Sequence, residues 1–157
     1  MQRLLRKVRE LLRRDDGTQL IEFAIVFPVL LLLFAGTAEL GRLFYTYTTL
    51  AKATRGGARY LSLQVDVAQS TTAGKNIVLC GNAGGCGGAG QPAVIVPNLT
   101  AGNIVVTPPA SGTGTKYVTV AIASYNYTPL VFNLNGMTGG NFNITLTPST
   151  TMRYMRN

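Results

Sequence analysis

Side chains that support catalysis or metal binding are unevenly distributed along this 157-residue chain. It contains no histidine, and Asp66 is the last of its six acidic residues, so residues 67–157 hold no Asp, Glu or His. General acid–base catalysis, catalytic triads and metal centres draw on these side chains. We therefore expect a protein that is not an enzyme, with no catalytic residue, no metal site and no cofactor.

The two cysteines, Cys80 and Cys86, bracket the sequence Gly-Asn-Ala-Gly-Gly. Their spacing differs from Cys-x-x-Cys and they have no His or carboxylate neighbours, which argues against zinc. Outside the inner membrane, a disulfide is the ordinary state of such a pair. We expect a bridge that staples an otherwise disordered glycine turn, and a second interpretation places this loop at a contact surface.

One carboxylate, Glu22, is the only charge between Thr18 and Ala38, a stretch of 21 residues. About 20 apolar residues cross a bilayer as a helix, so a transmembrane helix is predicted at 18–38. Carboxylates inside a membrane are costly and usually functional. The uncharged run that follows Glu22 is 16 residues long, so a tolerated carboxylate at the cytoplasmic interface is the simpler interpretation.

A basic leader, residues 1–17, precedes this span and carries six basic and three acidic residues. Basic flanks stay in the cytoplasm, so the C-terminal part is predicted to be extracytoplasmic in a single-pass inner-membrane protein. The leader's leucines recur at helical spacing, as in an interfacial helix. We expect no nucleic-acid partner, because the basic cluster abuts the span and only four basic residues follow Asp66.

The junction between leader and span resembles a known signal. Gly17 is followed by an apolar helix with a glutamate at the fifth place, as in type IV pilins. The segment from Gln19 to Phe34 is similar to the start of TadE-like proteins, which are minor pilins (pseudopilins) of the tight-adherence, or Flp, pilus. Further similarity lies in 39–45 and 53–60 and, more loosely, in 117–130 and 144–153.

This resemblance implies cleavage by a prepilin peptidase between Gly17 and Thr18, and assembly roles for Glu22, Phe23 and Pro28. The implied partners are the inner membrane, other pilins or pseudopilins and the pilus assembly platform, with possible incorporation in the pilus. The alternative for Gly17 is that it only breaks the leader helix ahead of the span.

Beyond the span, apolar residues keep helical spacing and predict an amphipathic helix at 39–65 that continues from the membrane and covers a sheet. Pro28 is expected to kink the combined helix, and Gly56-Gly57 to form a soft point in it. Residues 66–157 are rich in Gly, Thr, Asn and Pro and predict a small, β-rich extracytoplasmic domain. Its expected strands are Asn76–Leu79, Ala93–Val96, Asn103–Thr107, Tyr117–Ala123, Tyr125–Phe132, Asn141–Thr147 and Thr151–Met155, with a connecting loop at 108–114.

The predicted fold class is therefore α+β, a long kinked helix followed by a small antiparallel domain. The preferred interpretation is a minor pilin that acts by helix packing to initiate, cap or support a filament. The first alternative is an uncleaved membrane anchor that displays an envelope binding or adhesion domain. The second is an enzyme secreted after signal-peptidase cleavage at Gly36-Thr-Ala38, which the missing acid–base residues disfavour.

Overall fold

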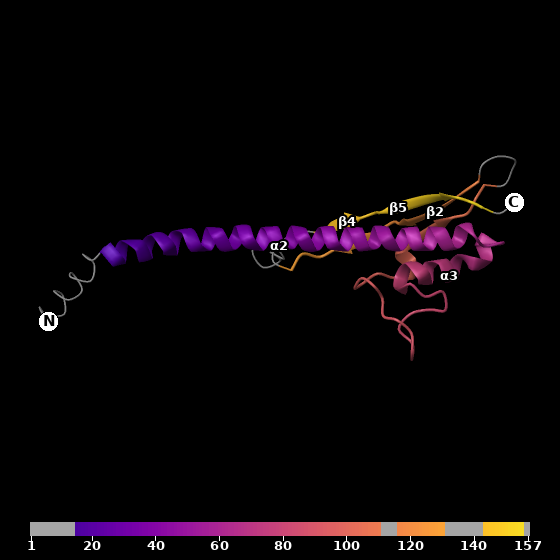
Figure 1. Ribbon diagram of the computed structural model, residues 1–157, viewed down its shortest axis with the longest axis horizontal. Helices are drawn as coiled ribbons and strands as arrows, with labels where there is room; N and C mark the ends of the chain where they lie inside the picture. Colours follow the sequence, from indigo (N-terminus) through magenta and orange to yellow (C-terminus); the bar gives the residue numbers. More distant parts are fainter. Residues whose placement is uncertain (1–14, 111–115, 131–142, 156–157) are drawn as a thin grey trace, which may run out of the picture. The chain divides into compact units, whose positions relative to one another are not determined.

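The computed structural model describes residues 15–110, 116–130 and 143–155. Its first described element is the helix α2, Asp15–Ser62, 48 residues long (Figure 1). The helix begins three residues before the predicted start of the span. It ends at Ser62, where the amides of Leu63 and Gln64 donate to carbonyls three residues back. Residues 1–14 of the predicted leader lie outside the part of the chain that the structure describes.

The chain divides into two compact units, Met1–Leu40 and Gly41–Asn157, and the second is called the outer unit below. The first contains the apolar part of α2, with Pro28 inside the helix. A proline in a helix interior removes one backbone hydrogen bond. The kink expected at Pro28 stays a prediction. The predicted domain limits also stay predictions.

A second helix, α3 (Val67–Cys80), opens the region where strands were predicted. The strand expected at Asn76–Leu79 is therefore wrong. Asp66 caps this helix, since its carboxylate accepts hydrogen bonds from the amides of Ala68 and Gln69 at 2.8 and 3.3 Å. Gly81 ends it in the left-handed conformation at φ 75°. These caps outweigh the β-branched run Ile77-Val78.

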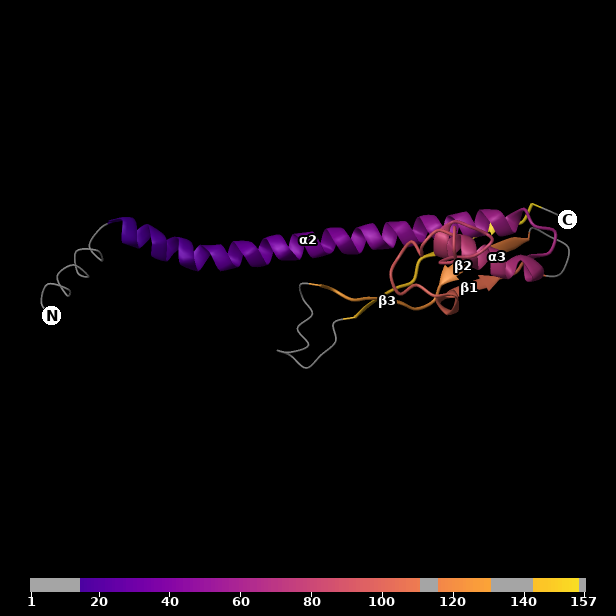
Figure 2. The same ribbon diagram turned by 90° about the horizontal axis from the view of Figure 1, so that it is seen from below.

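The strands are short and antiparallel: β1 Ile104–Thr107, β2 Tyr117–Ile122, β3 Tyr125–Tyr127, β4 Ile144–Leu146 and β5 Ser149–Arg153. The first sheet has the order β1-β2-β5, and β3 pairs with β4 in a separate ladder. Figure 2 labels β1, β2 and β3, and Figure 1 labels β4 and β5. A single turn of 3-10 helix, Ala101–Asn103, precedes β1. The α+β class, with a long apolar helix followed by antiparallel strands, is confirmed.

Five of the predicted runs contain a strand, but each strand is shorter than or offset from its run. Ala93–Val96 is not a strand. The amide of Ile95 instead donates to the carbonyl of Leu79, in the last turn of α3. The Tyr125 run is a strand only as far as Tyr127. Its last two residues, the start of the Asn141 run and the loop residues 111–114 lie outside the described residues.

One face of the β1-β2-β5 sheet packs on the outer part of α2. Buried positions of α2 recur every three or four residues, at Leu50, Thr54, Ala58 and Leu61. The three apolar ones form one core cluster with Val118, Val120 and Ile122 of β2. Thr54 Oγ1 lies 3.0 Å from Thr150 Oγ1 of β5. The amphipathic prediction for 39–65 is therefore confirmed from Leu50 onward. Phe44 and Tyr47, which belong to its apolar spacing, are exposed.

The helices α2 and α3 touch where both have glycines. A Cβ added at Gly57 would overlap the Val78 side chain and lie 3.2 Å from the Gly74 carbonyl oxygen. A Cβ added at Gly74 would lie 2.7 Å from Leu61 Cγ. Gly57 is therefore a close-packing position rather than a soft point in the helix.

We expect Gly57→Ala to destabilise the outer unit and Gly56→Ala to leave it unchanged or more stable. Overpacking costs about 1–3 kcal/mol, which exceeds the gain in helix propensity of about 1 kcal/mol. The neighbouring Gly56 is the matched control, because its added Cβ would meet only Ile77 Cγ2, at 3.7 Å. Thermal melts of the two purified variants give the comparison, and equal melting temperatures would contradict the packing role.

Candidate functional site

The predicted processing site lies within a helix. Gly17 is part of α2, which begins at Asp15. Whether Gly17 breaks the leader helix stays a prediction, because residues 1–14 lie outside the described part of the chain. A peptidase binds extended backbone, so cleavage after Gly17 requires this end of α2 to unwind, and glycine lowers the cost of leaving the helical conformation.

The predicted assembly residues lie on the exposed surface of α2. Every side chain from Thr18 to Phe34 is exposed, Glu22 and Phe23 among them. The helix includes an 18-residue window of mean hydropathy 2.3, none of it buried. Phe23 stacks on Phe27 one turn later, with ring centroids 5.2 Å apart. Such a surface calls for lipid or other helices as its cover, and it anchors the chain in a membrane.

Glu22 follows Thr18 by four residues in this helix, so both lie on one face, a turn apart. Cleavage after Gly17 would place an α-ammonium group on Thr18 within a turn of the carboxylate. A pair of this kind compensates a charge that is costly in the membrane. The chemistry available here is electrostatic pairing and helix packing. Pro28, six residues after Glu22 in the same helix, has no backbone N–H.

Cys80 and Cys86 form a disulfide in the structure. Cys80 is the last residue of α3 and is buried, and Cys86 packs against the same core cluster. The bridge closes the turn that follows α3, where Gly85 and Gly87 adopt positive φ of 125° and 75°. The bridge therefore holds this glycine-rich segment against the end of α3, together with the hydrogen bond from the Asn76 side chain to the Ala83 carbonyl at 3.2 Å.

We predict that these cysteines are also bridged in the protein recovered from its own envelope. Closing a loop this short stabilises modestly, by about 2 kcal/mol. Alkylation without reductant, followed by mass measurement, should find no modified thiol, whereas alkylation after reduction should find two. Two labelled cysteines without reductant would contradict the bridge.

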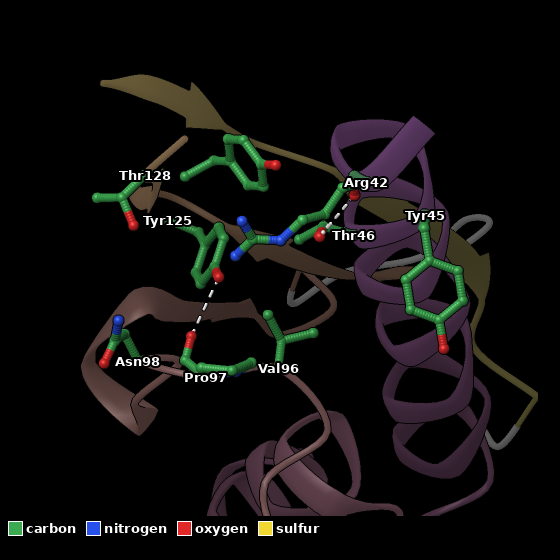
Figure 3. A pocket seen from close by; sticks show the side chains of 9 residues that line it. Arg42, Tyr45, Thr46, Val96, Pro97, Asn98, Tyr125 and Thr128 are labelled. Carbon is green, nitrogen blue, oxygen red and sulfur yellow. Dashed lines mark hydrogen bonds between the residues drawn. The ribbon is translucent and has the colours of Figure 1, made fainter. Parts of the chain in front are cut away.

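A cavity of about 350 Å³ lies in the outer unit between the start of its helical part and the turn before the first strand (Figure 3). Its lining comes from three segments: Arg42, Tyr45 and Thr46 of α2; Val96, Pro97 and Asn98; and Tyr125, Tyr127 and Thr128.

The polar groups of this cavity contact each other. The Arg42 guanidinium carbon lies 5.4 Å from the Tyr127 ring centroid, a cation–π distance. The Tyr125 hydroxyl donates to the Pro97 carbonyl at 3.0 Å (Figure 3). Asn98 beside it has a positive φ of 63°, which asparagine tolerates better than most residues. These contacts tie α2, the 96–98 turn and β3 together, so the cavity has a structural role.

Burial raises the pKa of the Tyr125 phenol above its ordinary 10.0, with the Arg42 charge acting in the opposite direction. The folded state therefore keeps this proton at a pH where the unfolded chain releases it. The neutral phenol therefore contributes its full share of the free energy of unfolding below about pH 10, and this contribution declines as the pH rises above that value.

Tyr125→Phe is expected to lower the free energy of unfolding by about 1 kcal/mol at neutral pH, since it leaves the Pro97 carbonyl without its donor. Above pH 10 the variant should lose stability less steeply than the wild type. The control is Tyr117→Phe, at a side chain that is 53 % exposed. Thermal melts across pH 7 to 11 compare them, and parallel curves for wild type and Tyr125→Phe would count against this account.

Sequence reasoning missed the contacts of Arg42 and Tyr125. In the sequence, Arg42 was only a basic residue after the span, and Tyr125 was only the first residue of a predicted strand. Among the described residues no group of three or more His, Cys, Asp or Glu could hold a metal ion.

Comparison with known proteins finds a family match for the N-terminal part of the chain. Residues 17–59 match the family model described as TadE-like protein. The match begins at Gly17, contains Glu22, Phe23 and Pro28, and leaves the region after residue 59 uncovered. No curated protein and no solved structure matches the chain. TadE-like proteins are associated with the tight-adherence (Flp) pilus system. The match covers 43 of the 157 residues and supports a TadE-like protein.

Proposed function

We propose that this TadE-like protein is a minor pilin that joins the tight-adherence pilus machinery by packing its apolar helix against those of other pilins. The observation that carries the proposal is the surface of α2, where every side chain from Thr18 to Phe34 is exposed. The helix extends from this surface into a folded outer unit, whose core includes Leu50 and Leu61. This is the architecture needed to hold a subunit in the membrane before it enters a filament.

In this proposal the basic leader is cytoplasmic and the outer unit lies beyond the inner membrane. A prepilin peptidase removes the leader after Gly17, and the assembly platform then brings the subunit to the filament. The protein acts by assembly rather than catalysis. It starts, caps or supports the filament, and the outer unit becomes part of its exposed surface.

Replacing residues 18–38 by an unrelated leucine–alanine span of the same length tests this function. A pilin needs the particular surface of its helix, so the replaced protein should insert and keep its outer unit folded, yet fail to co-purify with other pilins. A membrane anchor needs only an apolar span. Normal pili and normal co-purification would therefore favour the anchor that displays a binding or adhesion domain.

The matched control exchanges Leu31 and Leu32 for alanines in an otherwise native helix. It keeps Thr18, Glu22, Phe23 and Pro28 in place and removes little apolar surface. We expect this control to insert and to assemble.

A further inference from the structure

The outer unit is strongly basic. From Gly41 to Asn157 the sequence contains eight basic residues and one acidic residue, Asp66. The Asp66 carboxylate accepts hydrogen bonds from the amides of Ala68 and Gln69 as the cap of α3. The positive charge of this unit therefore has almost no acidic counterpart within it.

Three of these basic residues lie on one exposed face of α2, the stem face, defined here as Lys52, Arg55 and Arg59. They are spaced at i, i+3 and i+7, so they form one row along about 10 Å of helix. All three are exposed, and none makes a side-chain hydrogen bond or ion pair with any residue that the structure describes. The opposite face, with Leu50, Thr54 and Ala58, is buried against the sheet.

We propose that the stem face binds an acidic helix of a different pilin subunit. This inference rests on the proposed function, because it names the chemistry of the neighbour that the minor pilin accepts. A row of cations at helical spacing complements carboxylates at i, i+3 or i+4, and i+7 on a second helix.

A second copy of this chain does not fit. Its corresponding helix would bring three more cations to the face, and like charges in contact cost several kcal/mol. The one carboxylate of its outer unit, Asp66, already caps a helix. The stem face therefore excludes self-stacking and selects a heterologous neighbour, so the subunit does not form a shaft of identical copies through this face.

Anionic lipid is a poorer fit than an acidic helix. Lys52 follows Ala38, the last residue of the predicted span, by 14 residues, about 21 Å along a helix. The polar region on each side of the hydrocarbon is only about 5–8 Å thick. The stem face also lacks the large apolar side chains that an interfacial helix inserts among lipids.

The test uses charge reversal in the full-length protein, co-expressed with each of the other pilins of its own system. Arg55→Glu with Arg59→Glu reverses the row. Lys116→Glu with Arg153→Glu is the matched control, since it changes net charge equally and Arg153 is exposed on the edge strand β5. Both variants should melt at the wild-type temperature.

We expect the wild type and the control to co-purify with at least one pilin that has an acidic helix. The amount of that pilin recovered with the Arg55/Arg59 variant should be at least about tenfold lower. Reversing the carboxylates of that pilin to lysine should restore the complex. Equal recovery with all three proteins, or equal loss in both variants, would overturn the inference while leaving the minor-pilin role intact. Wild type that co-purifies with no pilin would instead contradict the proposed function.

Two further outcomes would also overturn it. The first is cross-linking of two copies of this chain through cysteines placed at Lys52. The second is reversal-sensitive binding to vesicles containing phosphatidylglycerol without any effect on pilin recovery.

Discussion

Glu22→Gln is expected to leave the protein inserted, folded and cleaved but to stop its assembly with other pilins. The carboxylate lies on the exposed surface of α2, one turn from Thr18. After cleavage, the Thr18 ammonium can pair with Glu22 of its own helix or of a neighbour at a different height. The second pairing satisfies both charges only when the subunits are in register.

Co-purification with the other pilins and counts of pili on cells measure this effect. Loss of the pair should lower both at least about tenfold, equivalent to about 1.4 kcal/mol in binding. Glu22→Asp is the control that keeps the charge, and it should retain more assembly than Glu22→Gln. Normal piliation with Glu22→Gln would show that Glu22 is only a tolerated interfacial carboxylate.

Gly17→Leu is expected to leave full-length protein in the membrane. Cleavage needs the helical backbone at Gly17 to become extended beside the membrane surface. Leucine is a better helix former than glycine by up to about 1 kcal/mol, and its side chain would obstruct the peptidase cleft. Gly17→Ala tests the two effects separately, since alanine stabilises the helix but adds only one methyl group.

Migration on a denaturing gel separates the processed from the unprocessed chain, which differ by residues 1–17. Identical migration of wild type and Gly17→Leu would reject cleavage at this bond. The two sites should also be coupled, because an uncleaved chain has no ammonium at Thr18. In the Gly17→Leu background, Glu22→Gln should therefore have no additional effect on assembly.

The long helix was predictable because its signals are local and repeated. The run from Thr18 to Ala38 is too apolar for a solvated loop, and the stripe containing Leu50 and Leu61 continues the helical period. Family resemblance added what periodicity could not, namely the meaning of Gly17 and Glu22.

The second helix was not predictable from its β-branched residues. Ile77-Val78 favours a strand locally, whereas the caps at Asp66 and Gly81 and the packing at Gly74 favour the helix. Similarly, Gly57 looked like a weakness because the side chain that fills its space, Val78, is 21 residues away in the sequence. Helical spacing already placed Lys52 and Arg59 opposite the apolar stripe, and the structure added that the sheet covers that stripe and leaves this basic face exposed.

The intact mass and N-terminal sequence of the protein isolated from its own cells test the minor-pilin account most directly. The account predicts a mature chain that begins at Thr18, with residues 1–17 absent. A chain that begins at Met1 would contradict it in favour of an uncleaved anchor. A chain that begins at Glu39 would contradict it in favour of a secreted protein freed by signal peptidase.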